Sequence, residues 1–258
     1  MSTHYETLQH ADTYREAFAV EPPAALGERH LWPRKPGFFI VHAATATALV
    51  QGPASTVSAV EEAAPTTASD TLSDAASTRV LVPAQWGLVP HWVKSASDAK
   101  LRAPKLVNAK SDLASTVTAF RDAWLNGQRC IVPMVAFYED DLRSGKAVPT
   151  RVARVDGKPM GVAGLWARWQ GAGAESGEVI ISYCLLTVNA NNHALLHRYG
   201  QPGSEKSMPA ILNEGAYDAW LTARPDKAKE FMRQYAAEKL TANPVEKKAD
   251  KVPKGWLG

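Results

Sequence analysis

The sequence predicts an α+β fold built on an antiparallel or mixed β-sheet. Apolar, β-branched runs of strand character follow one another through the middle of the chain, with only turns between them. Helical periodicity is confined to a few separate segments. The sequence shows neither the strand–helix alternation of a parallel sheet nor a glycine-rich phosphate loop. Its 258 residues, 45% of them hydrophobic, are enough for one domain with a substantial core.

Four segments carry helical signals. The first covers residues 6–18. In the second, Ser111 is a favourable N-cap, apolar residues then recur with a helical period up to Trp124, and Gly127 ends the helix. The two others follow residue 213 and residue 225, where an asparagine and a proline favour helix starts.

The strand signals are runs rich in Val, Ile, Leu and aromatic residues. Turn residues separate several of them, including the sequence RSGK at 143–146, which predicts a hairpin. The expected strands are residues 38–41, 79–82, 106–110, 129–138, 150–155, 160–169, 179–188 and 211–212.

The domain is expected to cover residues 1–240. Residues 44–78 are rich in Ala, Ser and Thr with few large apolar side chains, so they cannot offset the entropy of ordering. We interpret them as a flexible insertion, because strand character resumes directly afterwards. Residues 241–258 are charged and contain proline, and are expected to be a loose tail.

Charge is unevenly distributed, although the net charge is only +3. Residues 94–154 contain eleven Lys/Arg and six Asp/Glu, an excess of +5, whereas residues 43–79 carry −3. A basic central region favours an anionic partner, with nucleic acid first; ordinary surface charge is the alternative.

The two cysteines, Cys130 and Cys184, lie in apolar strand-like runs, where free thiols behave as small hydrophobic groups. The sequence has no disulfide framework, metal-ligand spacing or cofactor motif, so we expect neither a metal nor a cofactor. It also has no signal peptide pattern and no run of about 20 apolar residues that could cross a bilayer. We therefore expect a soluble, cytoplasmic monomer without membrane contact.

Glu139 is the first candidate for chemistry. It follows a buried strand and two aromatic residues, where lost solvation raises the pKa of a carboxylate toward values useful for proton transfer. A helix cap or a surface acid beside Asp140 and Asp141 is the alternative, and structural carboxylates are the more numerous class.

Six short motifs occur in an order that resembles one family, the SOS response-associated peptidases (SRAP), which process abasic sites in DNA. The resemblance covers residues 1–240 apart from 44–78. The motifs are WGLVPHW at 86–92, NAK at 108–110, RCIVP with FYE at 129–139, AGLW at 163–166, LTVNA at 186–190 and PGSEKSMPAIL at 202–212.

The resemblance implies one α+β domain, with a barrel-like twisted sheet, flanking helices and a positively charged groove for single-stranded DNA. Aromatic side chains in such a groove stack on bases, and Lys or Arg holds phosphate. Core packing is the alternative for the tryptophans. The candidate groove residues are Trp86, His91, Trp92, Lys94, Lys110 and Arg129.

The resemblance also implies a mechanism. In the family, removal of the initiator Met exposes a Cys whose α-amine and thiolate add to the abasic aldehyde and close a thiazolidine, assisted by a Glu, an Asn and a His. Glu139 matches the Glu and Asn108 the Asn. This chain departs from the pattern at Ser2 and Gly200, which stand at the Cys and His positions. Lys110 also replaces the family's usual Arg, which keeps the charge and loses the bidentate geometry.

Three functions are compatible with these residues. A free Ser2 amine can form a transient Schiff base with an abasic site, with Glu139 moving protons and His197, His193 or His4 replacing the missing imidazole. The protein can instead bind single-stranded or abasic-site DNA without chemistry. Thirdly, it can be an N-terminal-serine hydrolase, which requires a base beside a weak hydroxyl nucleophile.

Overall fold

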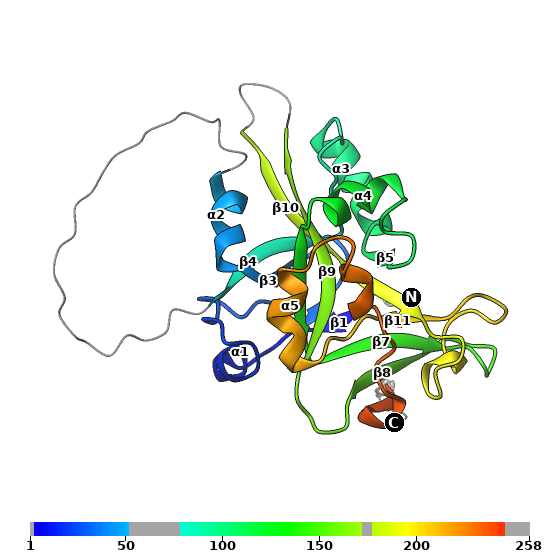
Figure 1. Ribbon diagram of the computed structural model, residues 1–258. Coiled ribbons are helices and arrows are strands. Elements are labelled where there is room, and N and C mark those ends of the chain that lie inside the picture. Colours follow the sequence, from blue (N-terminus) through cyan, green and yellow to red (C-terminus); the bar gives the residue numbers. More distant parts are fainter. Residues whose placement is uncertain (1–2, 52–77, 172–176, 246–258) are drawn as a thin grey trace, which may run out of the picture.

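A closed barrel of five strands forms the centre of the computed structural model, which describes residues 3–51, 78–171 and 177–245 (Figure 1). The strands lie in the order β10, β4, β3, β6 and β9, and pairing of β9 with β10 closes the ring. All neighbours are antiparallel except β10 and β4, which are parallel. The predicted α+β fold with a barrel-like mixed sheet is therefore confirmed.

The barrel strands correspond to the longest β-branched runs of the sequence, because side chains that are buried on a curved sheet favour such residues. Two short strands, β5 (Asn108–Lys110) and β11 (Ser207–Pro209), pair with the C-terminal half of β10. The barrel strands are β3 (Pro36–His42), β4 (Arg79–Trp86), β6 (Arg129–Met134), β9 (Met160–Gln170) and β10 (Val179–Asn189).

A second, antiparallel sheet lies beside the barrel and carries the start of the chain. Its order is β12 (Leu240–Pro244), β8 (Val148–Arg154), β7 (Ala136–Asp141), β1 (Tyr5–Glu6) and β2 (His30–Leu31). The single strand expected at 129–138 is thus two strands in two sheets. Val135 separates the two strands, and its N–H donates to the carbonyl of Glu6 at 2.8 Å.

Helices cover the outside of the barrel (Figure 1). α4 packs on β9, and α5 packs on β6 and β3. The helices are α1 (Ala11–Phe18), α2 (Ala43–Gln51), α3 (Ala96–Arg102), α4 (Thr118–Leu125) and α5 (Tyr217–Leu221). The 3₁₀ turns are η1 (Ala103–Lys105), η2 (Leu196–Arg198), η3 (Glu214–Ala216), η4 (Ala228–Phe231) and η5 (Ala237–Lys239).

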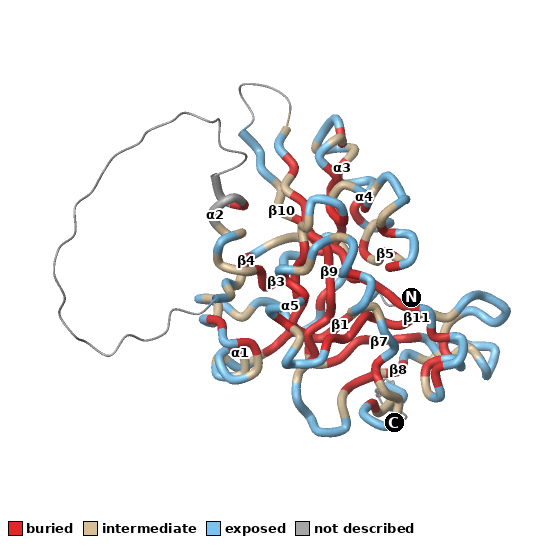
Figure 2. Tube along the Cα trace, in the orientation of Figure 1, coloured by how far each residue is buried: buried red, intermediate tan, exposed pale blue. Residues whose placement is uncertain are grey.

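The core fills the barrel and the space between the two sheets (Figure 2). Several of its large aromatic side chains have hydrogen-bonded polar atoms. The indole N–H of Trp220 donates to the carbonyl of Cys130 at 2.8 Å, and the hydroxyls of Tyr5 and Tyr183 lie 2.5 Å apart. Gly161 is required here, because a Cβ would lie 2.6 Å from the Tyr217 ring.

Two helix predictions were wrong in their bounds. Residues 6–18 do not form one helix: Tyr5–Glu6 pairs in β1, and α1 begins only at Ala11. Residues 111–117 form turns and a bend: the Ser111 N–H donates to the carbonyl of Thr187 at 2.9 Å, which continues the pairing of β5 with β10, and α4 begins only at Thr118.

The insertion and the tail also differ from expectation where the structure describes them. The first residues of 44–78 belong to α2, and 52–77 lie outside the described residues. The tail expected from residue 241 begins with β12, which pairs with β8, and 246–258 are not described. The helix expected after residue 225 is only the 3₁₀ turn η4. No helix within the described ranges is long and apolar enough to cross a membrane.

Candidate functional site

The pairing of β1 with β7 brings the start of the chain beside Glu139. Tyr5 pairs with Phe137, and the N–H of Tyr138 donates to the carbonyl of His4 at 3.1 Å. Continuing this antiparallel register places Thr3 opposite Glu139. The N-terminal segment and the second half of β7 therefore lie side by side within the second sheet.

A pocket of about 310 Å³ opens at this meeting point. Thr3 and His4 line it from the start of the chain, and Glu139 lines it from β7. A smaller pocket of about 100 Å³ adjoins it and shares Glu139 and Gly200 with it. Glu139 is buried, so the structure places a carboxylate at the wall between a larger and a smaller hollow.

The segment after η2 forms the other side of the pocket and lies near the tip of the β7–β8 hairpin (Figure 1). Its attachment is a backbone hydrogen bond from the Gly200 N–H to the Asp140 carbonyl at 2.9 Å. Gly200 has φ +76°, a left-handed conformation that favours glycine. A Cβ at this position would meet nothing within 4 Å, so the pocket is open there.

Three parallel rings form one wall of the pocket, and we call them the ring stack: Trp32, His4 and Tyr138. The His4 ring lies 4.0 Å from the Trp32 ring and 4.0 Å from the Tyr138 ring, with interplanar angles of 10° and 9°. Its Nε2 lies 3.0 Å from Nδ1 of His30. Burial and the neighbouring His30 lower the pKa of His4 to about 4, although Glu6 opposes the shift, so the stacked ring is neutral near pH 7.

An ion-pair network around the buried carboxylate of Glu6 holds β1 in place beside the ring stack. Glu6 accepts two hydrogen bonds from Arg151, at 2.8 and 3.0 Å, and one from the hydroxyl of Tyr138. Arg29 lies 3.5 Å from the same carboxylate. Burial alone would raise the pKa of Glu6, but the hydrogen bonds and the two guanidinium charges outweigh it and lower the pKa to about 2.

Asn108 and Lys110 lie on β5, and neither of them lines the two pockets. They alternate with buried Ala109, so their side chains share one face of the strand. Nζ of Lys110 lies 2.5 Å from the carboxylate of Glu205, which lines the smaller pocket. Glu205 also accepts a hydrogen bond from Asn189 at 3.1 Å. Ser2 lies outside the described residues, one peptide bond from Thr3.

The three histidines considered as replacements differ clearly in position. His193 is buried, with Nε2 2.7 Å from the carbonyl of Tyr235 and Nδ1 accepting the N–H of Leu196 at 3.0 Å, which is a structural role. His197 is exposed on η2 and holds the carbonyl of His193 at 2.8 Å, and it does not line the pocket. His4 is the one of the three that lines the pocket with Glu139.

Two of the expected groove residues are buried. Trp86 has no exposed surface, and its indole donates to the carbonyl of Val107 at 3.1 Å. Arg129 is buried with its guanidinium over the Trp124 and Trp220 rings. Both side chains therefore belong to the core, and neither can stack on a base or hold a phosphate in this structure.

The remaining groove candidates lie at the surface near α3. His91 and Lys94 are exposed, and Trp92 is half-buried with the guanidinium of Arg102 5.2 Å from its ring centre. His91 lies 3.7 Å from Asp122.

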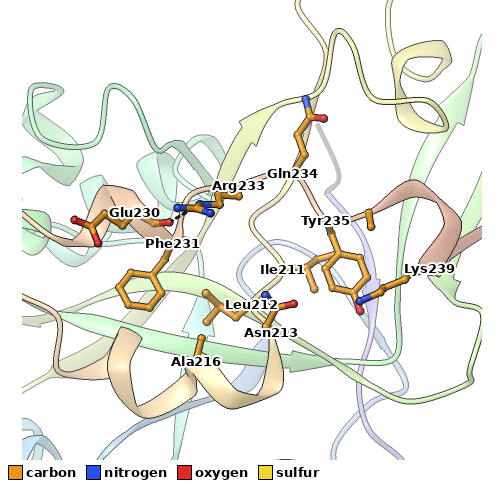
Figure 3. Close-up of a pocket in the computed structure, with 11 residues that line it drawn as sticks. Ile211, Leu212, Asn213, Ala216, Glu230, Phe231, Arg233, Gln234, Tyr235 and Lys239 are labelled. Carbon is orange, nitrogen blue, oxygen red and sulfur yellow. Dashed lines mark hydrogen bonds between the residues drawn. The ribbon is translucent and has the colours of Figure 1, made fainter.

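A pocket of about 430 Å³ lies away from these residues, between the chain after β11 and the segment from η4 to η5 (Figure 3). Its Arg233 donates to the backbone carbonyl of Glu230 at 3.0 Å, and Lys239 lies over the Tyr235 ring. It contains none of the candidate catalytic or groove residues that the sequence predicts, so the pocket at Glu139 is the candidate site.

Comparison with known proteins assigns the family. The family model of the SOS response associated peptidases (SRAP) matches residues 36–252, most of the chain. This protein belongs to the SRAP family. The SRAP match begins after β1, yet the residues directly before this strand, Thr3 and His4, line the pocket.

Two solved structures share the fold over most of the chain. A crystal structure of a protein from Bordetella bronchiseptica is 35% identical, with a TM-score of 0.76 over 95% of this chain and 99% of that one. One from Bacteroides thetaiotaomicron is 19% identical, with a TM-score of 0.69 over 95% and 92% of the two chains, and shows the same fold.

Two curated relatives carry functional names. The abasic site processing protein HMCES of Gallus gallus is 28% identical over 66% of this chain and 53% of its own length. The abasic site processing protein YobE of Bacillus subtilis is 25% identical over 62% and 68%. The chain thus spans about half the length of the HMCES proteins that it matches.

The sequence did not single out Trp32 or Tyr138 for the site. Tyr138 stands directly before Glu139, and alternation along a strand indicates that it faces the opposite side. Trp32 follows a two-residue strand that is too short to give a periodic signal, so only its pairing across β1 reveals its place.

Proposed function

We propose that this protein acts on abasic sites in single-stranded DNA, through a transient Schiff base between the Ser2 α-amine and the abasic aldehyde. The observation that carries the proposal is the pocket that joins the start of the chain to Glu139. Membership of the SRAP family and similarity to abasic site processing proteins supply the substrate class.

Each chemical step has a candidate group. Removal of Met1 as the initiator residue would free the Ser2 amine, whose pKa of about 7.7–8.0 leaves a nucleophilic fraction near neutrality. The amine nitrogen adds to the aldehyde carbon, and water leaves from the carbinolamine after protonation of its hydroxyl. Glu139 lies opposite Thr3 when the β1–β7 register is continued, and it is the proposed donor of that proton.

The imine can then follow two courses. Water can add and return the aldehyde and the amine. Alternatively, a base removes a proton from the sugar carbon next to the imine carbon, and the bond to the 3′ phosphate oxygen breaks with departure of the phosphate. Glu139, as a carboxylate after its first proton transfer, is the proposed base.

The Ser2 hydroxyl limits the durability of any adduct. Its attack on the imine would close an oxazolidine, which hydrolyses more readily than a thiazolidine. The proposed activity is therefore transient capture of the aldehyde, in contrast to the lasting cross-link that a Cys would give.

Basic residues outside the pocket are the proposed contacts of the DNA strand. Lys110 pairs with Glu205, which lines the smaller pocket, and Lys94, His91 and Trp92 are proposed to hold the strand farther away. Only about half of the HMCES length is represented here, so further activities of those relatives are not carried over.

Borohydride trapping tests the proposal directly. Borohydride reduces an imine to a stable amine, so wild-type protein should give a covalent adduct with an abasic single strand and none with an undamaged strand. Intact-mass measurement should show loss of Met1, and acetylation of the amine should abolish trapping. Salt-dependent binding without any trapped adduct would instead identify a non-catalytic DNA-binding protein.

A further inference from the structure

Trp32, the outer ring of the ring stack, is unusually exposed to solvent for a tryptophan. Trp32 is 48% exposed, whereas several other tryptophans, including Trp86, Trp124 and Trp220, are fully buried. Its inner face is covered by His4 at 4.0 Å. The structure records no ring contact on its other face among the described residues. An aromatic surface that is parallel to two further rings is therefore presented to solvent at the pocket.

The stack is rigid because both of its inner members are fixed. The Tyr138 hydroxyl donates to Glu6, and Glu6 is held by Arg151 at 2.8 and 3.0 Å. His4 is fixed by the backbone hydrogen bond from Tyr138 and by the contact of Nε2 with His30. A preorganised ring loses little conformational entropy when another ring stacks on it.

We propose that Trp32 is a stacking surface for a nucleobase of the single strand, next to the nucleotide held in the pocket beside Glu139. This inference rests on the proposed function and extends it to a neighbouring base. An abasic nucleotide leaves its neighbour without a stacking partner on one side, and Trp32 would replace that partner. Aromatic side chains accept any base in this way, because every base has a π-face.

Charge near the stack indicates a nucleic acid strand as the occupant. Arg29 and Arg34 flank Trp32 in sequence and are exposed. Arg34 enters no ion pair with another described residue, so its guanidinium is open to phosphate. The pocket itself carries the carboxylates of Glu139 and Asp140, which repel phosphate and suit a neutral sugar or base.

Fluorescence of a modified strand tests the stacking surface. The probe is a single strand with a tetrahydrofuran abasic analogue and 2-aminopurine as the adjacent base. The analogue has no aldehyde, so no Schiff base can form and the result does not depend on Ser2 chemistry. Stacking on an aromatic ring quenches 2-aminopurine, and binding of wild-type protein should therefore quench it.

Three variants complete the experiment at one fixed salt concentration. W32A should abolish the quenching and weaken affinity about 5- to 150-fold, the range expected for one stacked base. W32F keeps a ring and should keep most of both signals. L113A removes a Leu of similar exposure (44%) and should change neither. Circular dichroism checks that each variant is folded.

The outcomes separate this inference from the proposed function. Wild-type affinity and quenching in W32A would overturn the stacking surface and leave the proposed function intact, as would an equal loss in L113A. Failure of the wild-type protein to bind the strand at low salt would overturn both. Loss of quenching in W32A together with retention of quenching in W32F supports the inference, whatever the result of borohydride trapping.

Discussion

The backbone N–H of Gly200 donates to the carbonyl of Asp140 at 2.9 Å, so the segment after η2 is fastened directly beside Glu139. Gly200 stands where the SRAP resemblance expects a His. Gly200 has a φ of +76°, and a Cβ built at this position would contact nothing within 4 Å. Space is available, whereas the backbone conformation is unfavourable for any residue other than glycine.

A histidine at this position would therefore enter the pocket at a cost in stability. G200A and G200H should both lower the free energy of unfolding by about 1–2 kcal/mol, measured by urea denaturation, because both impose a Cβ on a left-handed residue. Only G200H adds an imidazole to the pocket. We expect it to trap more abasic strand per minute than G200A, and equal rates in the two variants would show that the imidazole does not reach the reacting atoms.

Removal of the Glu139 carboxylate should stop proton transfer without loss of binding. E139Q keeps the size of the side chain and should slow borohydride-trapped adduct formation about 10²- to 10⁴-fold, the usual range for a general acid or base. Its affinity for a tetrahydrofuran strand should stay within about twofold of wild type. D140N alters the exposed acid next to it and is the matched control; an equal loss there would indicate a general charge effect.

Substitution of Ser2 should change the lifetime of the adduct. In S2C, the thiolate and the α-amine of one residue can both add to the aldehyde and close a five-membered thiazolidine. S2C should therefore give an adduct that survives a denaturing gel without borohydride. T3C places the thiol one residue away from the α-amine and should not. A stable adduct in T3C, or none in S2C with Met1 removed, would contradict the proposed role of the N-terminus.

Much of the barrel was predictable from the sequence, because strands that are buried on both faces need long β-branched runs. The strands expected at 160–169 and 179–188 correspond to β9 and β10, and the stop at Gly127 coincides with φ +68°. Glu139 was also predictable as a buried acid, although it lies within β7 and not at the end of the strand. These features depend on residues that are neighbours in the sequence, so they can be predicted from one sequence.

The helical pattern from residue 111 shows where local sequence is insufficient. Leu113 and Val117 fit the periodicity of Phe120 and Trp124, yet they are exposed and precede the helix. The Ser111 N–H bonds to the carbonyl of Thr187, so residue 111 continues the pairing of β5 with β10, and the chain turns before α4 begins. A periodic pattern does not record such tertiary pairing, which overrides helical propensity.

The candidate site depends on strand pairing, which the hydrophobic periodicity of the sequence does not reveal. β1 and β2 contain two residues each, but their pairing places His4 against Trp32 and Tyr138. The burial of Trp86 was equally hidden, because an aromatic residue near basic ones can face either the groove or the core. Sequence therefore located the catalytic carboxylate candidate and missed the aromatic wall beside it.

Loss of the Glu6 charge should loosen the strand that carries the N-terminus. E6Q leaves Arg151 and Arg29 without their shared carboxylate, which typically costs about 3–5 kcal/mol for a fully buried pair. Arg29 is 64% and Arg151 32% exposed, so water can partly replace the partner, and we expect a loss on the order of 2–3 kcal/mol. E230Q, which breaks an exposed pair with Lys227, should cost less than about 1 kcal/mol.

The pH dependence of this loss follows from the lowered pKa of Glu6. The unfolded carboxyl takes up a proton near its ordinary pKa of 4.5, whereas the folded one stays ionised until about 2. Its contribution to stability is therefore complete above pH 4.5 and disappears as the pH falls to about 2. The difference in unfolding free energy between wild type and E6Q should shrink over that window; a constant difference would place the stabilisation in packing alone.

The titration of His4 should make the unfolding free energy depend on pH in a second, higher range. Burial in the ring stack and the neighbouring His30 lower its pKa from 6.5 to about 4, so between these values the unfolded state binds a proton that the folded state does not. Stability should consequently fall as the pH drops from 6.5 to 4, by at most about 1.4 kcal/mol per pH unit for one proton. H4F keeps a stacked ring but cannot titrate, so its unfolding free energy should change less steeply across this range. Urea denaturation at closely spaced pH values measures both slopes, and an identical slope in H4F would mean that His4 is protonated in the folded protein.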